Sequence, residues 1–127
     1  MVNPKKVRHN YWEYLEDIED LAIDEADEAE KAKAAGKPEN EAKHAAEAVS
    51  WLNELAAEKA NAENKKANLK HPGPEPRSDA PESEKKSWEI QRDVYNSNLK
   101  LYINQIEVIE QRYKRARKRI QAAGIPL

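Results

Sequence analysis

A long apolar heptad in the last third of the chain limits the fold more than any other feature. Apolar residues recur at alternating intervals of three and four, with Arg92 as the one interruption. We call this row the seam, and it consists of Trp88, Tyr95, Leu99, Tyr102, Ile106, Ile109, Tyr113, Ala116, Ile120 and Ala123. A heptad sustained over about five repeats is typical of a coiled-coil helix. The pattern therefore predicts one helix over residues 79–124, about 67 Å long at 1.5 Å per residue.

The same helix carries a second apolar row. Val94, Leu101 and Val108 repeat every seven residues, roughly 100° around the helix from the row that contains Tyr95 and Tyr102. A helix with two apolar rows needs a neighbour on each of them. The second row therefore indicates a bundle.

Two earlier segments also have helical spacing, but with smaller side chains. The first predicted face consists of Leu15, Ile18, Ala22, Ala26 and Ala29. The second predicted face consists of Ala42, Ala45, Val49, Leu52 and Ala56. Small side chains let two helices approach closely, so residues 1–69 are expected to form an antiparallel hairpin of helices at about 4–35 and 38–69.

The ends of these helices are marked by capping residues. Gly36 can end the first helix and Pro38 can begin the second. Two starts compete for the first helix: Asn3 as N-cap with Pro4 at the first helical position, or Asn10 with a glutamate three residues later in a capping box. The sequence alone leaves both starts open.

A proline-rich stretch separates the hairpin from the long helix. Residues 70–78, KHPGPEPRS, form a connector that would span about 28 Å if extended. The long helix at 79–124 and a short tail at 125–127 follow it. We find no strand-like alternation, so the predicted class is all-α: an antiparallel helical hairpin plus a long third helix, packed as a coiled-coil-like three-helix bundle.

The apolar content predicts a thin core. Leu, Ile and Val together make 21 of 127 residues and there is no Phe, which is below the roughly 20% under which disorder becomes a concern. The formal net charge is only -2, so the composition still favours a folded protein, helped by self-association or by a partner. No apolar run approaches the ~18 residues needed to cross a bilayer. We expect no membrane contact and a cytoplasmic location, or a place in the virion if the protein is viral.

The stretch RYKRARKR at residues 112–119 holds six cations in eight positions. Such a cluster can bind a polyanion in a salt-dependent way. Tyr113 is its one aromatic residue and lies on the seam, which argues against a stacking platform for bases. The candidate polyanion contacts are Arg112, Lys114, Arg115, Arg117, Lys118 and Arg119.

An acidic block gives the same cations a second interpretation. Residues 13–30 hold ten carboxylates and no cation. In an up-down-up bundle the first and third helices run parallel, and aligning Ala35 with Ala123 places residues 112–119 beside residues 24–31. Each exposed ion pair contributes only ~0.2–1 kcal/mol, but blocks of opposite charge set register and orientation. We favour this structural pairing over nucleic-acid binding.

Catalytic and metal-binding patterns are weak. Glu41 and His44 form one Glu-x-x-His motif, whereas di-iron bundles use two such motifs with two further glutamates. The chain has no cysteine, no glycine-rich phosphate loop, no HExxH and no nucleophile elbow. We expect no catalytic residue, no metal, no cofactor and no small-molecule ligand.

Together these features predict a non-catalytic helical assembly or adaptor protein. It would be a structural component of a larger assembly, such as a phage or secretion particle. Its partner would be a copy of itself or another protein subunit, contacted through the seam and the region around Trp88. Nucleic-acid binding through residues 112–119 is the second hypothesis.

Overall fold

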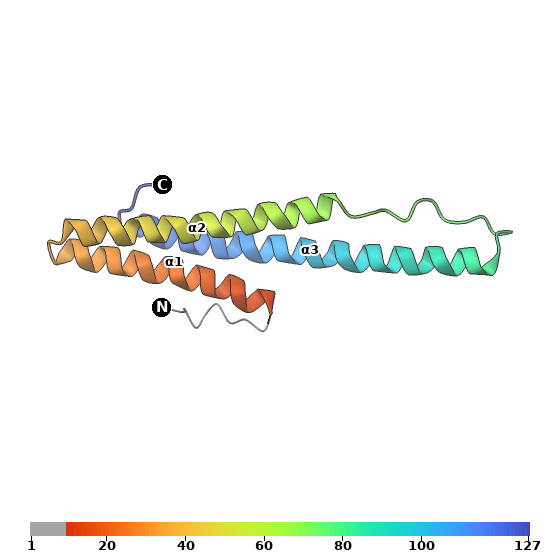
Figure 1. Cartoon of the computed structure of the whole chain (residues 1–127), viewed down its shortest axis with the longest axis horizontal. Helices are drawn as coiled ribbons and strands as arrows, with labels where there is room; N and C mark the ends of the chain where they lie inside the picture. Colours follow the sequence, from red (N-terminus) through yellow and green to blue (C-terminus); the bar gives the residue numbers. More distant parts are fainter. Residues whose placement is uncertain (1–9) are drawn as a thin grey trace.

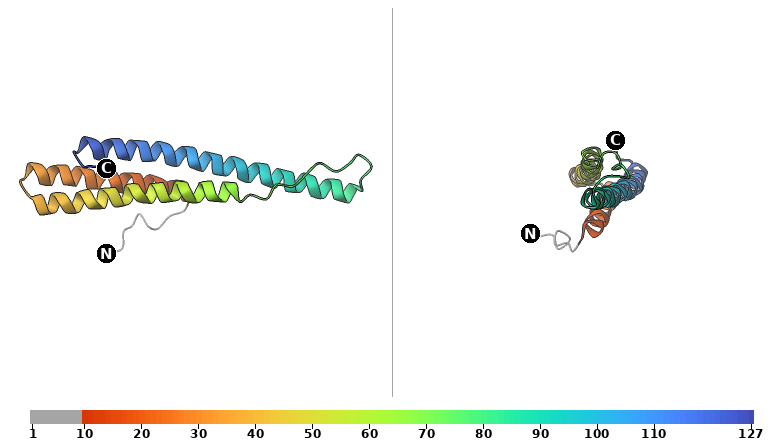
Figure 2. Two further views of the ribbon diagram at one scale, coloured as in Figure 1. Left: turned by 90° about the horizontal axis from the view of Figure 1, so that it is seen from above. Right: turned by 90° about the vertical axis from the view of Figure 1, so that its right-hand side faces the viewer.

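The computed structural model describes residues 10–127 and contains three helices, α1 (Tyr11–Ala34), α2 (Pro38–Ala67) and α3 (Glu82–Ala122). Helices α1 and α2 are antiparallel, and α3 returns in the direction of α1 (Figure 1). Seen end-on, the three helices form a triangle (Figure 2). Each helix packs against both of the others, and the described residues form no strand. The predicted all-α class and three-helix bundle are therefore confirmed.

Asn10 fixes the start of α1. Its backbone is extended, with φ −155° and ψ 166°, and its side-chain oxygen accepts a hydrogen bond of 2.9 Å from the backbone N–H of Glu13. This is the arrangement that satisfies one of the unpaired N–H groups of a first helical turn. The helix thus begins at the second of the two expected starts; the first, at Pro4, lies outside the described residues.

Helices α1 and α3 end in the same way. Gly36 and Gly124 have φ of 70° and 80°, in the left-handed region that favours glycine. After α3, the backbone N–H of Ile125 donates to the carbonyl of Ile120 at 3.3 Å, and the equivalent bond closes α1. These bonds form Schellman motifs. Ile125 is buried as a result, so the end of α3 is folded onto the core.

Helix α3 begins three residues later than the sequence predicted. The expected start was Asp79, but Pro81 is the N-cap and Glu82 the first helical residue. The proline ring holds Pro81 at φ −60° with ψ 147°. A residue that precedes a proline is disfavoured in the helical conformation, so Ala80 cannot easily join the helix. Proline therefore sets this end of the helix.

The core is thin and consists largely of alanine. On α1, the residues expected to be buried are buried. On α2, the buried face includes Ala48 and Leu55, whereas the expected Ala42 and Ala56 are exposed. Alanines occur on several sides of this helix, so its apolar spacing does not define one face. The largest fully buried side chains are Leu15, Ile18, Leu55, Ile109 and Ile120.

Helix α3 extends beyond the ends of α1 and α2. Lys59 of α2 pairs with Glu110 at 3.2 Å, and Glu19 of α1 pairs with Arg112 at 2.8 Å. Helix α2 ends eight residues after Lys59, and α1 begins eight residues before Glu19. At equal rise per residue, both ends lie level with roughly residues 101–104 of α3. Residues 82–101 therefore extend past the hairpin (Figure 1), and we call them the overhang.

We expect Leu55→Ala to lower the free energy of unfolding by about 2–5 kcal/mol, since it removes a fully buried side chain and leaves a cavity. The same truncation at Leu127, which is exposed, should change stability by less than about 0.5 kcal/mol. Urea unfolding followed by circular dichroism measures both. Equal effects at the two positions would contradict the assigned core.

Candidate interaction surfaces of helix α3

Two of the clustered cations meet at one carboxylate of α1. Arg112 donates from Nη1 to Oε1 of Glu19 at 2.8 Å. Arg115 donates from Nε to Oε2 at 2.8 Å and from Nη2 to Oε1 at 2.9 Å. The two arginines are three residues apart, so their side chains share one side of the helix. Both oxygens of Glu19 are therefore held by α3.

Glu19 is the one charged residue among the buried side chains of residues 10–127, with 6% of its surface exposed. Burial raises the pKa of its carboxyl group, because a desolvated anion is disfavoured. The hydrogen bonds and positive charges of Arg115 and Arg112 outweigh burial, so the pKa lies below its ordinary value. Glu19 is thus a charged group inside the bundle that depends on both arginines.

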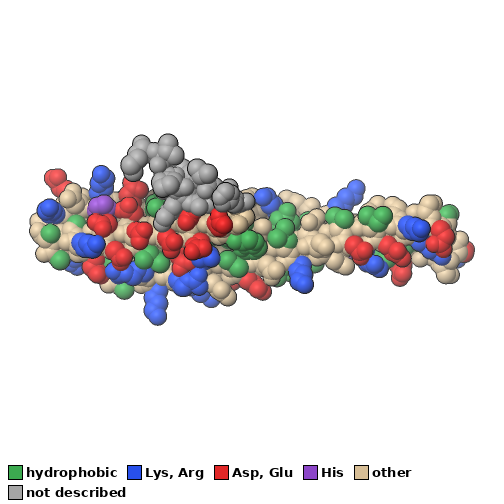
Figure 3. Space-filling model, turned by 90° about the horizontal axis from the view of Figure 1, so that it is seen from below, with side chains coloured by type: hydrophobic (Ala, Val, Ile, Leu, Met, Phe, Trp, Pro, Cys, Tyr) green, Lys and Arg blue, Asp and Glu red, His purple; other side chains and the backbone are tan. Residues whose placement is uncertain are grey.

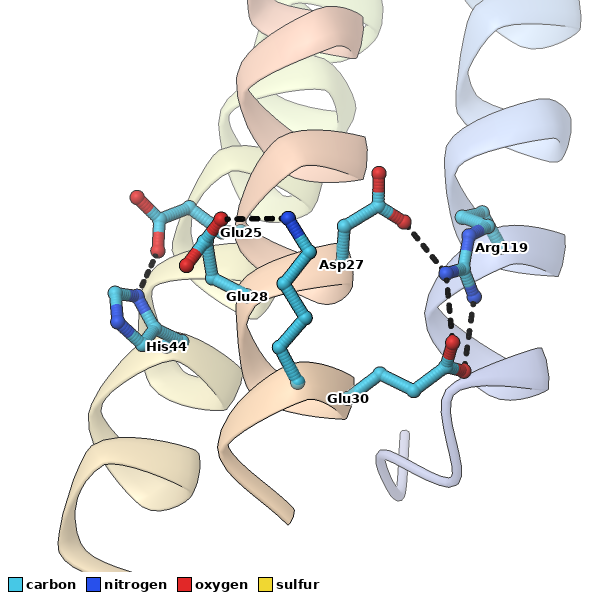
Figure 4. A network of polar contacts seen from close by, with 7 residues as sticks. Glu25, Asp27, Glu28, Glu30, His44 and Arg119 are labelled. Carbon is cyan, nitrogen blue, oxygen red and sulfur yellow. Dashed lines mark hydrogen bonds and ion pairs between the residues drawn. The ribbon is translucent and has the colours of Figure 1, made fainter. Parts of the chain in front are cut away.

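Arg119 extends the ion pairing by one further step along the same side of α3. Its guanidinium contacts Asp27 and lies 3.2 Å from Oε1 of Glu30. Figure 4 shows this fork, with the arginine of α3 between the two carboxylates of α1. The ion pairs follow the parallel direction of the two helices: carboxylates nearer the C-terminus of α1 pair with arginines nearer the C-terminus of α3.

The register of this pairing differs from the expected one. Alignment of helix ends predicted that residues 112–119 would lie beside residues 24–31, but Arg112 and Arg115 bind Glu19 instead. Long side chains in a helix point back toward its N-terminus. Arginine is longer than glutamate or aspartate, so its charged end is displaced further in this direction, toward carboxylates earlier along α1. Only Arg119, with Asp27 and Glu30, pairs within the predicted segment.

The other three cations of the cluster do not face α1. Lys114, Arg117 and Lys118 are exposed, and the structure records no ion pair for them with any residue from 10 to 127. Lys114 and Arg117 border a groove of about 590 Å³ between α2 and α3, whose remaining lining residues are Leu55, Ala56, Lys59, Glu110 and Tyr113. Half of the candidate polyanion contacts are thus structural pairs, and half remain available at the surface.

The predicted seam lies on the covered side of α3, with different neighbours along its length. Toward the C-terminus, its buried members pack in the core of the hairpin: Ile109, Ala116, Ile120 and Ala123. The remaining seam residues are partly buried: Trp88, Tyr95, Leu99, Tyr102, Ile106 and Tyr113. No expected seam residue is exposed.

The connector covers one side of the overhang. It runs back along α3 from the tip toward α2 (Figure 1). The indole Nε1 of Trp88 donates to the carbonyl of Gly73 at 3.0 Å, and the ring of His71 lies edge-on to Tyr95 with 5.1 Å between centroids. Trp88, around which the sequence predicted a partner contact, packs on the connector in the structure.

Another side of the overhang is apolar and exposed. Ile90, Val94 and Leu101 have 65%, 54% and 41% of their surface exposed. Their spacings of four and seven place them in one row. The space-filling view shows hydrophobic side chains on the overhang, whereas charged groups dominate the surface around α1 (Figure 3). The sequence predicted that a neighbouring helix would cover this row. Val108 packs against the core as predicted, but Val94 and Leu101 are exposed.

His44 pairs with a carboxylate other than the one its motif suggests. Its Nδ1 lies 2.6 Å from Oε2 of Glu25, across the α1–α2 interface (Figure 4). Within the described part of the chain, no three His, Cys, Asp or Glu side chains gather as metal ligands would. The interaction of His44 in the structure is an interhelical pair.

Sequence reasoning missed the special position of Glu19. It treated the ten carboxylates as one solvated or counter-charged face. Glu19 lies four residues after Leu15 and three before Ala22, which places it at the edge of the predicted buried face. That spacing was the signal that could have singled it out. The groove between α2 and α3 had no sequence signal, because it depends on how the two helices meet.

Neither a scan against family models nor searches of curated proteins and of solved structures finds a match to this chain. None of the described helices combines the length and the hydrophobicity needed to cross a membrane.

We expect Glu19→Gln to destabilise the protein by roughly 1–3 kcal/mol near neutral pH, because it leaves two arginines without their anion. A carboxyl group with a lowered folded pKa stabilises the protein above its ordinary value of 4.5, and this contribution is lost as pH falls through the folded pKa. The difference between wild type and Glu19→Gln should therefore shrink below about pH 4.5.

Urea unfolding between pH 3 and pH 7 measures this difference. Glu16→Gln is the matched control, since Glu16 is exposed on the same helix, and it should stay within about 0.5 kcal/mol of wild type throughout. A difference for Glu19→Gln that persists unchanged at pH 3 would contradict the charged pairing.

Proposed function

We propose that this chain is a non-catalytic helical assembly protein, a structural component of a larger particle such as a phage or secretion assembly. It would act through coiled-coil-like packing of α3 against a copy of itself or another protein subunit. The observation that carries the proposal is the overhang, which presents three large apolar side chains in one row. Monomeric proteins seldom hold such a row on a projecting helix unless a partner covers it.

The form of α3 supports this proposal. It is a continuous helix of 41 residues, and its heptad runs through both the bundle and the overhang. The connector ties one side of the overhang in place through Trp88 and Tyr95. A partner would therefore meet a surface that is already ordered, so that association costs less conformational entropy.

The polar groups of the described bundle also fit a non-catalytic role. Glu19 is neutralised by two arginines, and Tyr11 and Tyr14 donate hydrogen bonds to Glu58 and Glu54 across α1 and α2. These interactions hold the helices together. Catalysis needs convergent polar groups in a concave site. The α2–α3 groove is lined by apolar residues, three cations and Glu110, and Glu110 is paired with Lys59.

We expect the wild-type chain to associate reversibly in sedimentation equilibrium, with an average mass above 14.6 kDa that falls on dilution. Val94→Lys should shift the equilibrium toward monomer, because association would then desolvate a charge. Asn96→Lys is the matched control: this exposed residue lies on the opposite side of the same turn. A wild-type chain that stays monomeric at millimolar concentration would contradict self-association and leave another subunit as the partner.

Nucleic-acid binding is the second candidate, and one observation favours it. Lys114, Arg117 and Lys118 share the side of α3 that points away from α1 and are exposed. Three cations on one side can contact phosphates. The weakness of this candidate is that the other three cations of the cluster pair with α1.

Under the assembly proposal, duplex DNA should bind no tighter than about 10⁻⁴ M at 150 mM salt, which is the weak end of the range for non-specific binding. A mobility-shift titration measures this affinity. Micromolar binding that falls steeply with salt and is lost in Lys114→Ala/Arg117→Ala/Lys118→Ala would favour nucleic acid over assembly. Lys65→Ala/Lys66→Ala, on the exposed end of α2, is the control for charge alone.

A further inference from the structure

We infer that the overhang binds the overhang of a second copy of this chain, with the two helices antiparallel and side by side. The second copy would lie on the side of α3 that α1 covers nearer the C-terminus of that helix. The inference rests on the proposed function, since it names the partner and the geometry of the assembly. The apolar row at Ile90, Val94 and Leu101 would be the contact surface in both copies.

The exposed row is a continuation of an interface that the chain already forms. Val108 follows Leu101 by seven residues, and Arg112, Arg115 and Arg119 continue at intervals of four, three and four. These spacings keep all of them on one side of α3. On this side the three arginines bind α1. The apolar row lies just beyond the N-terminal end of α1, on the side of α3 that α1 covers. This surface is therefore shaped to receive a helix.

The length of the uncovered surface selects the occupant. Residues 82–101 measure about 30 Å along the helix axis, and among the described residues no helix lies on their apolar row. The overhang of a second copy has the same length and carries the same row. A two-fold axis near residue 92 covers both surfaces at once, as in a self-complementary interface.

Steric exclusion decides the direction. In a parallel pair, the rest of the second α3 would need the space that α1 fills beside Arg112 and Arg119. In an antiparallel pair, the two hairpins lie at opposite ends and only the overhangs overlap. The antiparallel arrangement alone covers the row without displacing α1.

Charge permits this pairing. The overhang contains four acidic and four basic side chains, so two copies meet without net repulsion: Glu82, Glu84, Glu89, Asp93, Lys85, Lys86, Arg92 and Lys100. Ser87 and Ser97 flank the apolar row and are small enough to let two helices approach closely. A nucleic acid would gain nothing from a surface without net charge. Three apolar side chains per copy make a small interface, so we expect a dissociation constant on the order of micromolar.

Spin-label distances test the geometry, because the chain has no cysteine and a single introduced one gives a unique label. Lys100→Cys and Glu107→Cys place labels at exposed positions outside the row. In the antiparallel dimer the separation of the two labels should rise by about 3 Å per residue from the two-fold axis, to about 24 Å and about 45 Å. A parallel dimer would give nearly equal distances.

The two expected distances, together with at least a tenfold weaker association for Val94→Lys and none for Asn96→Lys, would support the inference. Equal distances, or a dimer that Val94→Lys leaves intact, would overturn it while leaving the assembly function in place. A chain that stays monomeric at millimolar concentration would overturn both the inference and the self-association form of the proposed function.

Discussion

The carboxylate of Glu19, held between Arg112 and Arg115, is the interaction on which the arrangement of α3 depends. A buried ion pair is not a large source of stability, since the attraction is offset by the loss of water around three charges. Its effect is on specificity. Any other register would bury this carboxylate without its partners, which is costly. The pair therefore fixes both the direction of α3 and its position along α1. That position decides how much of α3 extends past the hairpin.

The alanine-rich hairpin explains why such a fixed point is needed. Buried alanines allow α1 and α2 to approach closely, but small side chains on a smooth surface specify register poorly. Polar contacts supply what the core does not. Tyr11 bonds to Glu58, and His44 pairs with Glu25, each joining α1 to α2 at a defined level. Together with the ion pairs to α3, they align three helices whose apolar contacts alone would tolerate sliding.

The sequence predicted the elements of this fold better than their contacts. The heptad predicted the long helix, and Gly36 and Pro38 predicted the turn between the first two helices, because periodicity, positive φ and the fixed φ of proline are local properties. The pairing of basic and acidic blocks was predicted in kind, since it follows from topology. Its register was not, because side-chain direction moves each arginine along α1. The buried face of α2 was mispredicted at Ala42 and Ala56, since alanine does not mark one side of a helix. The exposure of Val94 was not predicted, because it depends on where α1 begins, and the sequence left two starts open.

The topology also has a consequence for the order of folding. The contacts of α1 with α2 cross a turn of three residues, whereas Arg112 and Arg115 reach Glu19 from 93 and 96 residues away. Closing a long loop costs more chain entropy than closing a short one, so we expect the hairpin to form early and α3 to dock on it late. The third of these helices to be translated would then also be the last to find its place, and until it docks the acidic side of the hairpin would lack its counter-charge.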